Sequence, residues 1–194
     1  MTCGEGGTLL VNDDRLMARA EMAHDKGTNR AQFVRGEVDH CSWVDVGSSL
    51  RPSEVTAALL LTQLEHMADI SHRRRHIWNL YREALQSLED AGDLQLPSVP
   101  PGCEHSGHLF YVLLARADQR NEFLAHLRSQ QVEALFHFVP LHSSAAGRRY
   151  GRLGGSMRVT EDVAGRLVRL PLHPGMSDSD VEYVVRAVNA AIAA

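Results

Sequence analysis

The stretch GEGGTLLVNDDRLMARAEMAHDKG, residues 4–27, places a glycine turn, an apolar run and a helical pattern in immediate succession. Residues 8–11 are mostly apolar and predict a buried strand that is entered from the glycine turn. Asp13 or Asp14 can then cap a helix that stops at Gly27. A strand followed by a helix is typical of an α/β fold. Because such a strand leaves an open edge, we expect an upstream segment or another chain to cover it.

The segment after this unit reads as a loop and then as a long helix. Residues 28–52 carry glycine, serine and charge without a sustained period, so we expect a long ordered loop. Ser53 can cap a strong helical pattern that continues to Gly92, either as one helix of roughly 35 residues or as two helices with a bend. This pattern predicts a helical link between two domains.

The remainder of the chain alternates strand and helix patterns, which predicts a small α+β domain. Ser177 and Asp180 resemble a capping pair for the last helix, which presents an apolar face to the core. The predicted strands are residues 108–114, 132–139 and 169–173, and the predicted helices before the last are residues 119–129 and 161–168. We therefore expect three parts: residues 1–52, an α/β portion; residues 53–91, a linking helix or helix pair; and residues 92–194, a small C-terminal α+β domain.

Composition excludes several function classes. The chain has 194 residues, of which 44% are hydrophobic, and a formal net charge of −4, which gives no attraction to nucleic acid. The apolar run near Leu59 is far shorter than the roughly 20 residues that span a bilayer, and the N-terminus lacks a signal pattern, so we expect a cytoplasmic protein. Cys3, Cys41 and Cys103 are widely spaced and indicate reduced thiols rather than a disulfide framework.

Several separated blocks resemble, in order, the DegT/DnrJ/EryC1/StrS family of aminotransferases, and together they cover nearly the whole chain. Several blocks in the same order are more specific than any one short motif. The blocks are TCGEGG (2–7), KGTNR (26–30), WVDVGSS (43–49), QLE (63–65), HFVPLH (137–142) and RLPL (169–172).

The resemblance implies the C-terminal part of a fold-type-I, aspartate aminotransferase-like transferase that uses pyridoxal 5'-phosphate (PLP). Residues 1–52 would then be a remnant of the PLP-binding large domain. In the family the Schiff-base lysine lies a few residues before the GEGG block, so we expect the catalytic lysine upstream of Met1 and an inactive chain when alone. Family members are dimers with sites at the interface, so we expect a homodimer or association with an N-terminal half.

The KGTNR and GSS blocks look most like dTDP-4-amino-4,6-dideoxygalactose transaminase. That resemblance implies a nucleotide-linked 4-keto-6-deoxy sugar as substrate, glutamate as amino donor, and a role in lipopolysaccharide or surface-polysaccharide biosynthesis.

Lys26 is the only lysine, and it is therefore the only candidate amine for an imine with PLP. A desolvated lysine can react with aldehydes. Its place at the end of a predicted helix instead favours a charged capping role.

The resemblance also implies binding residues, each of which has a structural alternative. Ser49 stands where many members have an asparagine that reaches the partner's PLP phosphate, or it helps Ser48 cap the following helix. Asn29 and Arg30 lie in a loop that the family brings near the sugar nucleotide, or they form an exposed turn.

His137 and His142 flank an apolar segment that, by resemblance, lies near the substrate pocket. An imidazole there could hydrogen-bond a sugar hydroxyl or a phosphate, or either histidine could be a structural residue. His72 and His76 have a spacing that zinc can use, but the arginines at 73–75 lie between them, so we expect no metal site and a solvated basic helix face.

Two other functions remain open. The chain could be a non-catalytic dimerisation or interaction module derived from such an enzyme. Residues 95–194 could also form an autonomous ferredoxin-like ligand-binding domain, because a fold does not specify a function.

Overall fold

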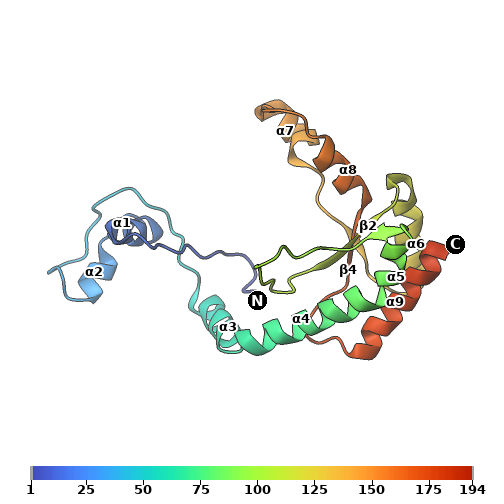
Figure 1. The fold of residues 1–194 in the computed structure, drawn as a ribbon. Coiled ribbons are helices and arrows are strands. Elements are labelled where there is room, and N and C mark those ends of the chain that lie inside the picture. Colours follow the sequence, from blue (N-terminus) through green and yellow to red (C-terminus); the bar gives the residue numbers. More distant parts are fainter. Residues whose placement is uncertain (1, 194) are drawn as a thin grey trace. The chain divides into compact units, whose positions relative to one another are not determined.

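The chain divides into two compact units, Met1–Met67 and Ala68–Ala194 (Figure 1). The structure is a computed structural model and describes residues 2–193. Each unit is described by itself below.

The first unit holds three helices, α1 (Asp14–His24), α2 (Arg30–Val34) and α3 (Glu54–Glu65). Two begin at the predicted caps. The Asp13 carboxylate accepts from the backbone N–H of Arg15 at 3.0 Å, and the Ser53 hydroxyl accepts from that of Thr56 at 3.2 Å. The predicted helix ahead of Gly27 is thereby confirmed. The loop predicted over residues 28–52 is correct except for the short helix α2, which the sequence pattern did not reveal.

The strand predicted at residues 8–11 is wrong. This segment is extended but pairs with no described strand, and Leu9 and Leu10 are 76% and 80% exposed. The apolar run has the composition of a buried strand. A strand also needs a partner, and no partner lies among residues 2–193.

The long helical pattern forms two main helices with a break between them, followed by a short third helix, rather than one continuous helix. The chain leaves helical geometry at His66, α4 (Met67–Ala84) follows directly, and α5 (Gln86–Asp90) adds one more short turn. Gly92, at φ +81°, ends the helical region as predicted. The two-helix alternative is therefore the correct one.

The second unit contains a four-stranded sheet of order β1-β2-β4-β3, in which every neighbouring pair is antiparallel. Phe110 pairs with Leu170 and Val112 with Val168, which sets the register of the two central strands. The strands are β1 (Leu94–Gln95), β2 (Phe110–Leu114), β3 (Leu135–Phe136) and β4 (Leu167–Leu170). The strand predicted over residues 132–139 is thus limited to two residues.

The remaining helices of this unit complete the α+β domain that the sequence predicted. Asp180 accepts from the backbone N–H of Ser177 at 2.7 Å, and the Ser177 hydroxyl accepts from that of Asp180 at 3.2 Å, so the predicted reciprocal cap is confirmed. The helices are η1 (Ala117–Gln119), α6 (Arg120–Ser129), η2 (Leu141–Ser143), α7 (Ala145–Tyr150), α8 (Arg158–Arg166) and α9 (Asp178–Ala193).

All buried hydrophobic residues of the core belong to the second unit. Figure 1 shows α4, α6 and α9 gathered beside β2 and β4. Phe110 lies at the centre, with its ring centroid 5.5 Å from that of Trp78 and 5.1 Å from that of Tyr81. The helices contribute Ile77, Tyr81, Phe123, Leu127, Val181, Val184 and Val188, and the strands contribute Phe110, Val112, Leu114, Val168 and Leu170. Among the helices of residues 2–193, none is long and apolar enough to cross a membrane.

Candidate functional site

In the first unit, two glycines bring the end of α1 against the segment before Ser49. Gly27 has φ +75°, and a Cβ added there would lie 1.8 Å from the carbonyl oxygen of Asp45. A Cβ on Gly47 would lie 2.1 Å from the nitrogen of Gly27. The Lys26 amide donates to the carbonyl of Ser48 at 3.1 Å. These close approaches require glycine and fix the loop that carries the candidate residues.

Asn29 holds this loop together. It is 8% exposed, its Oδ1 accepts from the backbone N–H of Ser42 at 2.7 Å, and its Nδ2 donates to the carbonyl of His40 at 3.4 Å. Its side chain therefore already has partners on both sides. Arg30 follows as the exposed first residue of α2, so its guanidinium is open to an anion.

Ser49 offers the phosphate of PLP one contact. It is exposed, its backbone forms a bridge with Asp25, and its hydroxyl has no hydrogen-bond partner among residues 2–193. Arg51, two residues on, is 3.3 Å from the Asp25 carboxylate and is thereby engaged. The donors present fit one hydrogen bond to a phosphate and do not make a complete phosphate site.

Lys26 does not lie in a pocket that would activate its amine. The residue is exposed and sits at φ +61°, directly after the C-terminal end of α1. A reactive lysine amine needs burial or a neighbouring cation that favours its neutral form. The position instead fits the predicted capping role at the C-terminal end of α1.

In the second unit, His137 opens onto an apolar cavity of about 560 Å³. Its walls include Phe138, Leu141, Val159 and Val163. The Nδ1 atom of His137 is buried and has no hydrogen-bond partner in the described chain. A buried polar atom without a partner is costly, so this nitrogen is an exception among the buried polar groups of the described chain.

His142 lines a second cavity, of about 850 Å³. Its Nε2 lies 3.1 Å from Oε1 of Glu161, which ties η2 to α8. Leu141 and Thr160 line both cavities, so the two share a wall. The structure thus places His137 and His142 on adjoining cavities, whereas Asn29, Arg30 and Ser49 belong to the other unit.

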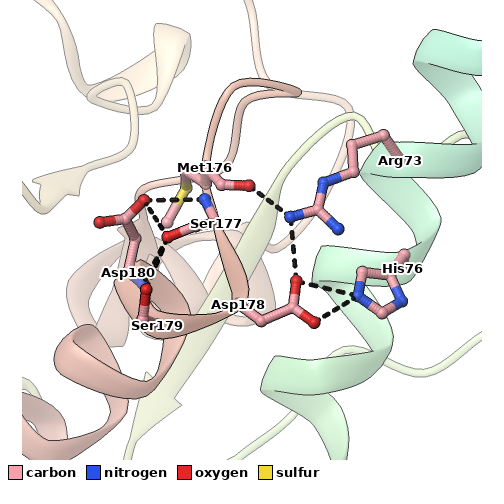
Figure 2. A network of polar contacts seen from close by, with 7 residues as sticks. All are labelled: Arg73, His76, Met176, Ser177, Asp178, Ser179 and Asp180. Carbon is pink, nitrogen blue, oxygen red and sulfur yellow. Dashed lines mark hydrogen bonds and ion pairs between the residues drawn. The ribbon is translucent and has the colours of Figure 1, made fainter.

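The basic face predicted on α4 is only partly exposed, because most of its side chains have partners in the described chain. Arg73 donates to the carbonyl of Met176 at 2.5 Å and to Asp178 at 2.9 Å, and His76 lies 3.1 Å from both carboxylate oxygens of Asp178 (Figure 2). Arg74 donates to the carbonyl of His108 at 2.9 Å, and Arg75 is 2.7 Å from Glu104. Each arginine has a different partner, which a charge pattern cannot reveal. These side chains tie α4 to two other segments, the loop before β2 and the start of α9.

Residues 148–152 were not singled out from the sequence, although Arg148, Tyr150 and Arg152 line the larger cavity. A signal was present: residues 134–160 contain four arginines and no aspartate or glutamate, in a chain whose net charge is −4. Charge counted over a window, rather than over the whole chain, would have identified this segment.

Comparison with known proteins places these features in a family. The sequence model described as the DegT/DnrJ/EryC1/StrS aminotransferase family matches residues 1–189. The erythromycin biosynthesis sensory transduction protein EryC1 of Saccharopolyspora erythraea is 29% identical over 188 residues, which are 96% of this chain and 47% of that protein. The chain spans about half the length of the curated relatives it matches.

Solved structures give the same result. DesV from S. venezuelae, solved in complex with a ketimine intermediate, is similar with a TM-score of 0.78 and 26% identity, over 94% of this chain and 46% of DesV. The PLP-form of the putative sugar aminotransferase Spr1654 from Streptococcus pneumoniae shares the fold, with a TM-score of 0.73 and 19% identity, over 94% of this chain and 45% of Spr1654. The fold is therefore that of part of a PLP aminotransferase, as the sequence predicted.

Proposed function

Because the chain belongs to the DegT/DnrJ/EryC1/StrS aminotransferase family, we propose that it is part of a transaminase that acts on a nucleotide-linked 4-keto-6-deoxy sugar. The match of residues 1–189 to the family carries this proposal. We assign glutamate as the amino donor and the dTDP-4-amino-4,6-dideoxygalactose-forming reaction as the type.

Members of the family are PLP-dependent aminotransferases. When bound, PLP supplies the electron sink that lets an amino group move from a donor to a keto sugar. The Ser49 hydroxyl is open to donate one hydrogen bond to a phosphate. The exposed Arg30 guanidinium can pair with an anion of the substrate, while Asn29 keeps the loop in shape.

In the second unit, His137 lines the smaller cavity, where its imidazole can hydrogen-bond a hydroxyl of the sugar. The apolar walls around it suit the methyl group of a 6-deoxy sugar. His142, held by Glu161, supports the wall between the two cavities.

The proposal assigns no Schiff-base lysine to residues 1–194. Lys26 is the only lysine, and it is exposed. Activity therefore requires a lysine supplied from elsewhere, from an N-terminal half on the same or another polypeptide.

The test is an amination assay. The protein is supplied with PLP, glutamate and a dTDP-4-keto-6-deoxy sugar, with and without the N-terminal half of a homologous aminotransferase. We expect amino-sugar formation only in the complemented reaction. Failure of a folded, PLP-loaded complemented complex to aminate any 4-keto nucleotide sugar would refute the proposal.

A second function is favoured by the apolar surface of the first unit. Leu9, Leu10, Val55, Leu59 and Leu61 are each more than half exposed. This surface suits a dimerisation or interaction module without catalysis. Light scattering that finds a monomer at all concentrations, together with a pull-down that recovers no second copy or intact aminotransferase, would count against it.

A further inference from the structure

The larger cavity of the second unit combines two free cations with an apolar wall. It lies among η2, α7, the turn at residues 151–157 and the first turn of α8, and it has a volume of about 850 Å³. The residues that decide its chemistry are Arg148, Arg152, Tyr150, Leu141, Leu153 and Met157. A cavity of this size accommodates a small organic molecule.

The positive charge at this cavity is not neutralised within the described chain. Neither Arg148 nor Arg152 has an ion pair or a side-chain hydrogen bond among residues 2–193. The two nearest carboxylates along the sequence are engaged elsewhere. Glu161 lies 3.1 Å from His142, and Asp162 lies 2.6 Å from Arg166. The two guanidinium groups are therefore open to an anion from outside.

The local backbone is fixed before any ligand arrives. Ser144 caps α7 by accepting from the amide of Gly147 at 2.9 Å. A Cβ on Gly147 would lie 1.8 Å from the carbonyl oxygen of Leu141, so α7 and η2 pack in direct backbone contact. A Cβ on Gly151 would lie 2.7 Å from the carbonyl oxygen of Gly147, which fixes the turn into Arg152.

The rest of the lining suits a flat organic group. Arg149 lies 5.0 Å above the ring of Tyr150, which holds that ring beside the cavity. Leu153 and Met157 give the cavity an apolar side. Guanidinium groups bind phosphate oxygens, often bidentately, and an aromatic ring stacks on a nucleobase.

We propose that this cavity binds a nucleoside diphosphate group, with Arg148 and Arg152 on the phosphates and Tyr150 against the base. The inference rests on the proposed function in one respect, that the substrate is a nucleotide sugar. It names the part of the chain that holds the nucleotide. Leu141 and Thr160 line both cavities, so the smaller cavity with His137 adjoins this one on the side where the sugar would continue.

The test is isothermal titration calorimetry of the protein with the diphosphates of adenosine, cytidine, guanosine, uridine and thymidine. Thymidine alone and inorganic pyrophosphate are the partial ligands. No PLP and no amino donor are present, so the result does not depend on transamination. We expect at least one nucleoside diphosphate to bind with a Kd below about 1 mM, and at least about tenfold more tightly than either partial ligand.

The double variant Arg148→Gln/Arg152→Gln should weaken that binding about tenfold or more, because two charge-assisted hydrogen-bonding groups are removed. Tyr150→Ala should weaken the nucleoside diphosphate about tenfold and leave pyrophosphate unchanged. The matched control is Arg128→Gln/Arg186→Gln, which removes the same charge from exposed residues away from the cavity. Circular dichroism checks that each variant is folded.

Three results would overturn the proposal: no diphosphate binds in this range, a partial ligand binds as tightly as the diphosphate, or the control variant loses as much affinity as the cavity variant. Each is independent of the amination assay. Loss of amination with intact nucleotide binding would refute the proposed reaction and leave the nucleotide site in place.

Discussion

Gly107 lies where the chain passes against the backbone of α4. It adopts φ +61°, and a Cβ there would lie 2.8 Å from the carbonyl carbon of Arg74. Gly102 adopts a similar φ of +77° with nothing within 4 Å of an added Cβ. Gly102→Ala should therefore lower the free energy of unfolding by about 1–2 kcal/mol, from backbone strain alone. Gly107→Ala should lower it by about 2–4 kcal/mol, because a backbone clash is added. Urea denaturation followed by circular dichroism measures both, and equal losses would contradict the close contact.

Tyr81 is a fully buried residue whose hydroxyl donates to the carbonyl of Pro171 at 2.9 Å. Burial, and secondly the charge of Asp180, raise the pKa of its phenol, so the group stays neutral and remains a donor. Tyr81→Phe should lower the free energy of unfolding by about 1–3 kcal/mol, because a partly buried carbonyl loses its partner.

The control is Tyr183→Phe, which removes a bond of the same length, 2.9 Å, from an exposed residue to the carbonyl of Gln130. Its effect should stay below about 0.5 kcal/mol. A Tyr81→Phe protein as stable as the Tyr183→Phe protein would show that the buried bond contributes little.

At the residue scale, helix caps could be predicted from the sequence, whereas hydrogen-bond partners distant in sequence could not. Asp13, Ser53 and Ser177 were identified from the sequence because each cap bonds within three residues of itself. Asn29 was expected at the substrate, and its side chain reaches residues 11 and 13 positions away. No local pattern carries that information. The assignments of Ser49, Arg30 and His137 to ligands stay predictions.

At the element scale, the start of α9 is tied to α4 through Asp178 (Figure 2). Hydrogen bonds from His76 first and Arg73 second lower the pKa of the Asp178 carboxyl below its ordinary value of 3.8. A carboxyl whose pKa is lower in the folded state stabilises the protein at pH values above 3.8. That contribution is lost as the pH falls through the folded-state pKa.

Asp178→Asn should therefore lower the Tm at pH 7. The difference from the parent protein should shrink once the pH falls below 3.8, and vanish when the carboxyl is protonated in the folded protein. Glu182→Gln on the same helix is the control, because Glu182 is exposed and its one ion-pair partner within residues 2–193, Arg186, is 4.0 Å away. Thermal melts across pH measure both, and a Tm difference that is the same at all pH values would contradict the ion pair.

Among the elements, helices could be predicted from the sequence more reliably than strands. The helices α1 and α9 followed from caps and a local apolar period, and α6 followed from its apolar period alone. The strands depended on partners distant in sequence. Residues 8–11 have strand composition without a described partner, and the predicted strand at 132–139 pairs with β4 only at Leu135 and Phe136. The helix α8 begins at Arg158, earlier than predicted. It also ends earlier, at Arg166, because β4 takes Leu167 and Val168 into the sheet.

At the scale of the whole molecule, the two units differ in how much apolar surface they bury. Every buried hydrophobic residue lies between Ile77 and Val188, whereas only Gly27 and Asn29 are buried among residues 2–67. Hydrogen exchange should therefore be slow at amides of β2, β4 and α9, and fast at amides of α1 and α3. Equal protection in both units, measured by mass spectrometry at a protein concentration low enough to prevent association, would contradict this difference.

The central claim is that the chain belongs to a PLP-dependent transaminase whose Schiff-base lysine is not among residues 1–194. It is tested most directly by incubating the protein with PLP, reducing with borohydride, and mapping pyridoxyl groups by peptide mass spectrometry. We expect no modification of Lys26 above that of a denatured control, because the amine is exposed and has no activating pocket. Stoichiometric pyridoxyl on Lys26, with an absorbance band that disappears on reduction, would contradict the claim and make this lysine the catalytic one.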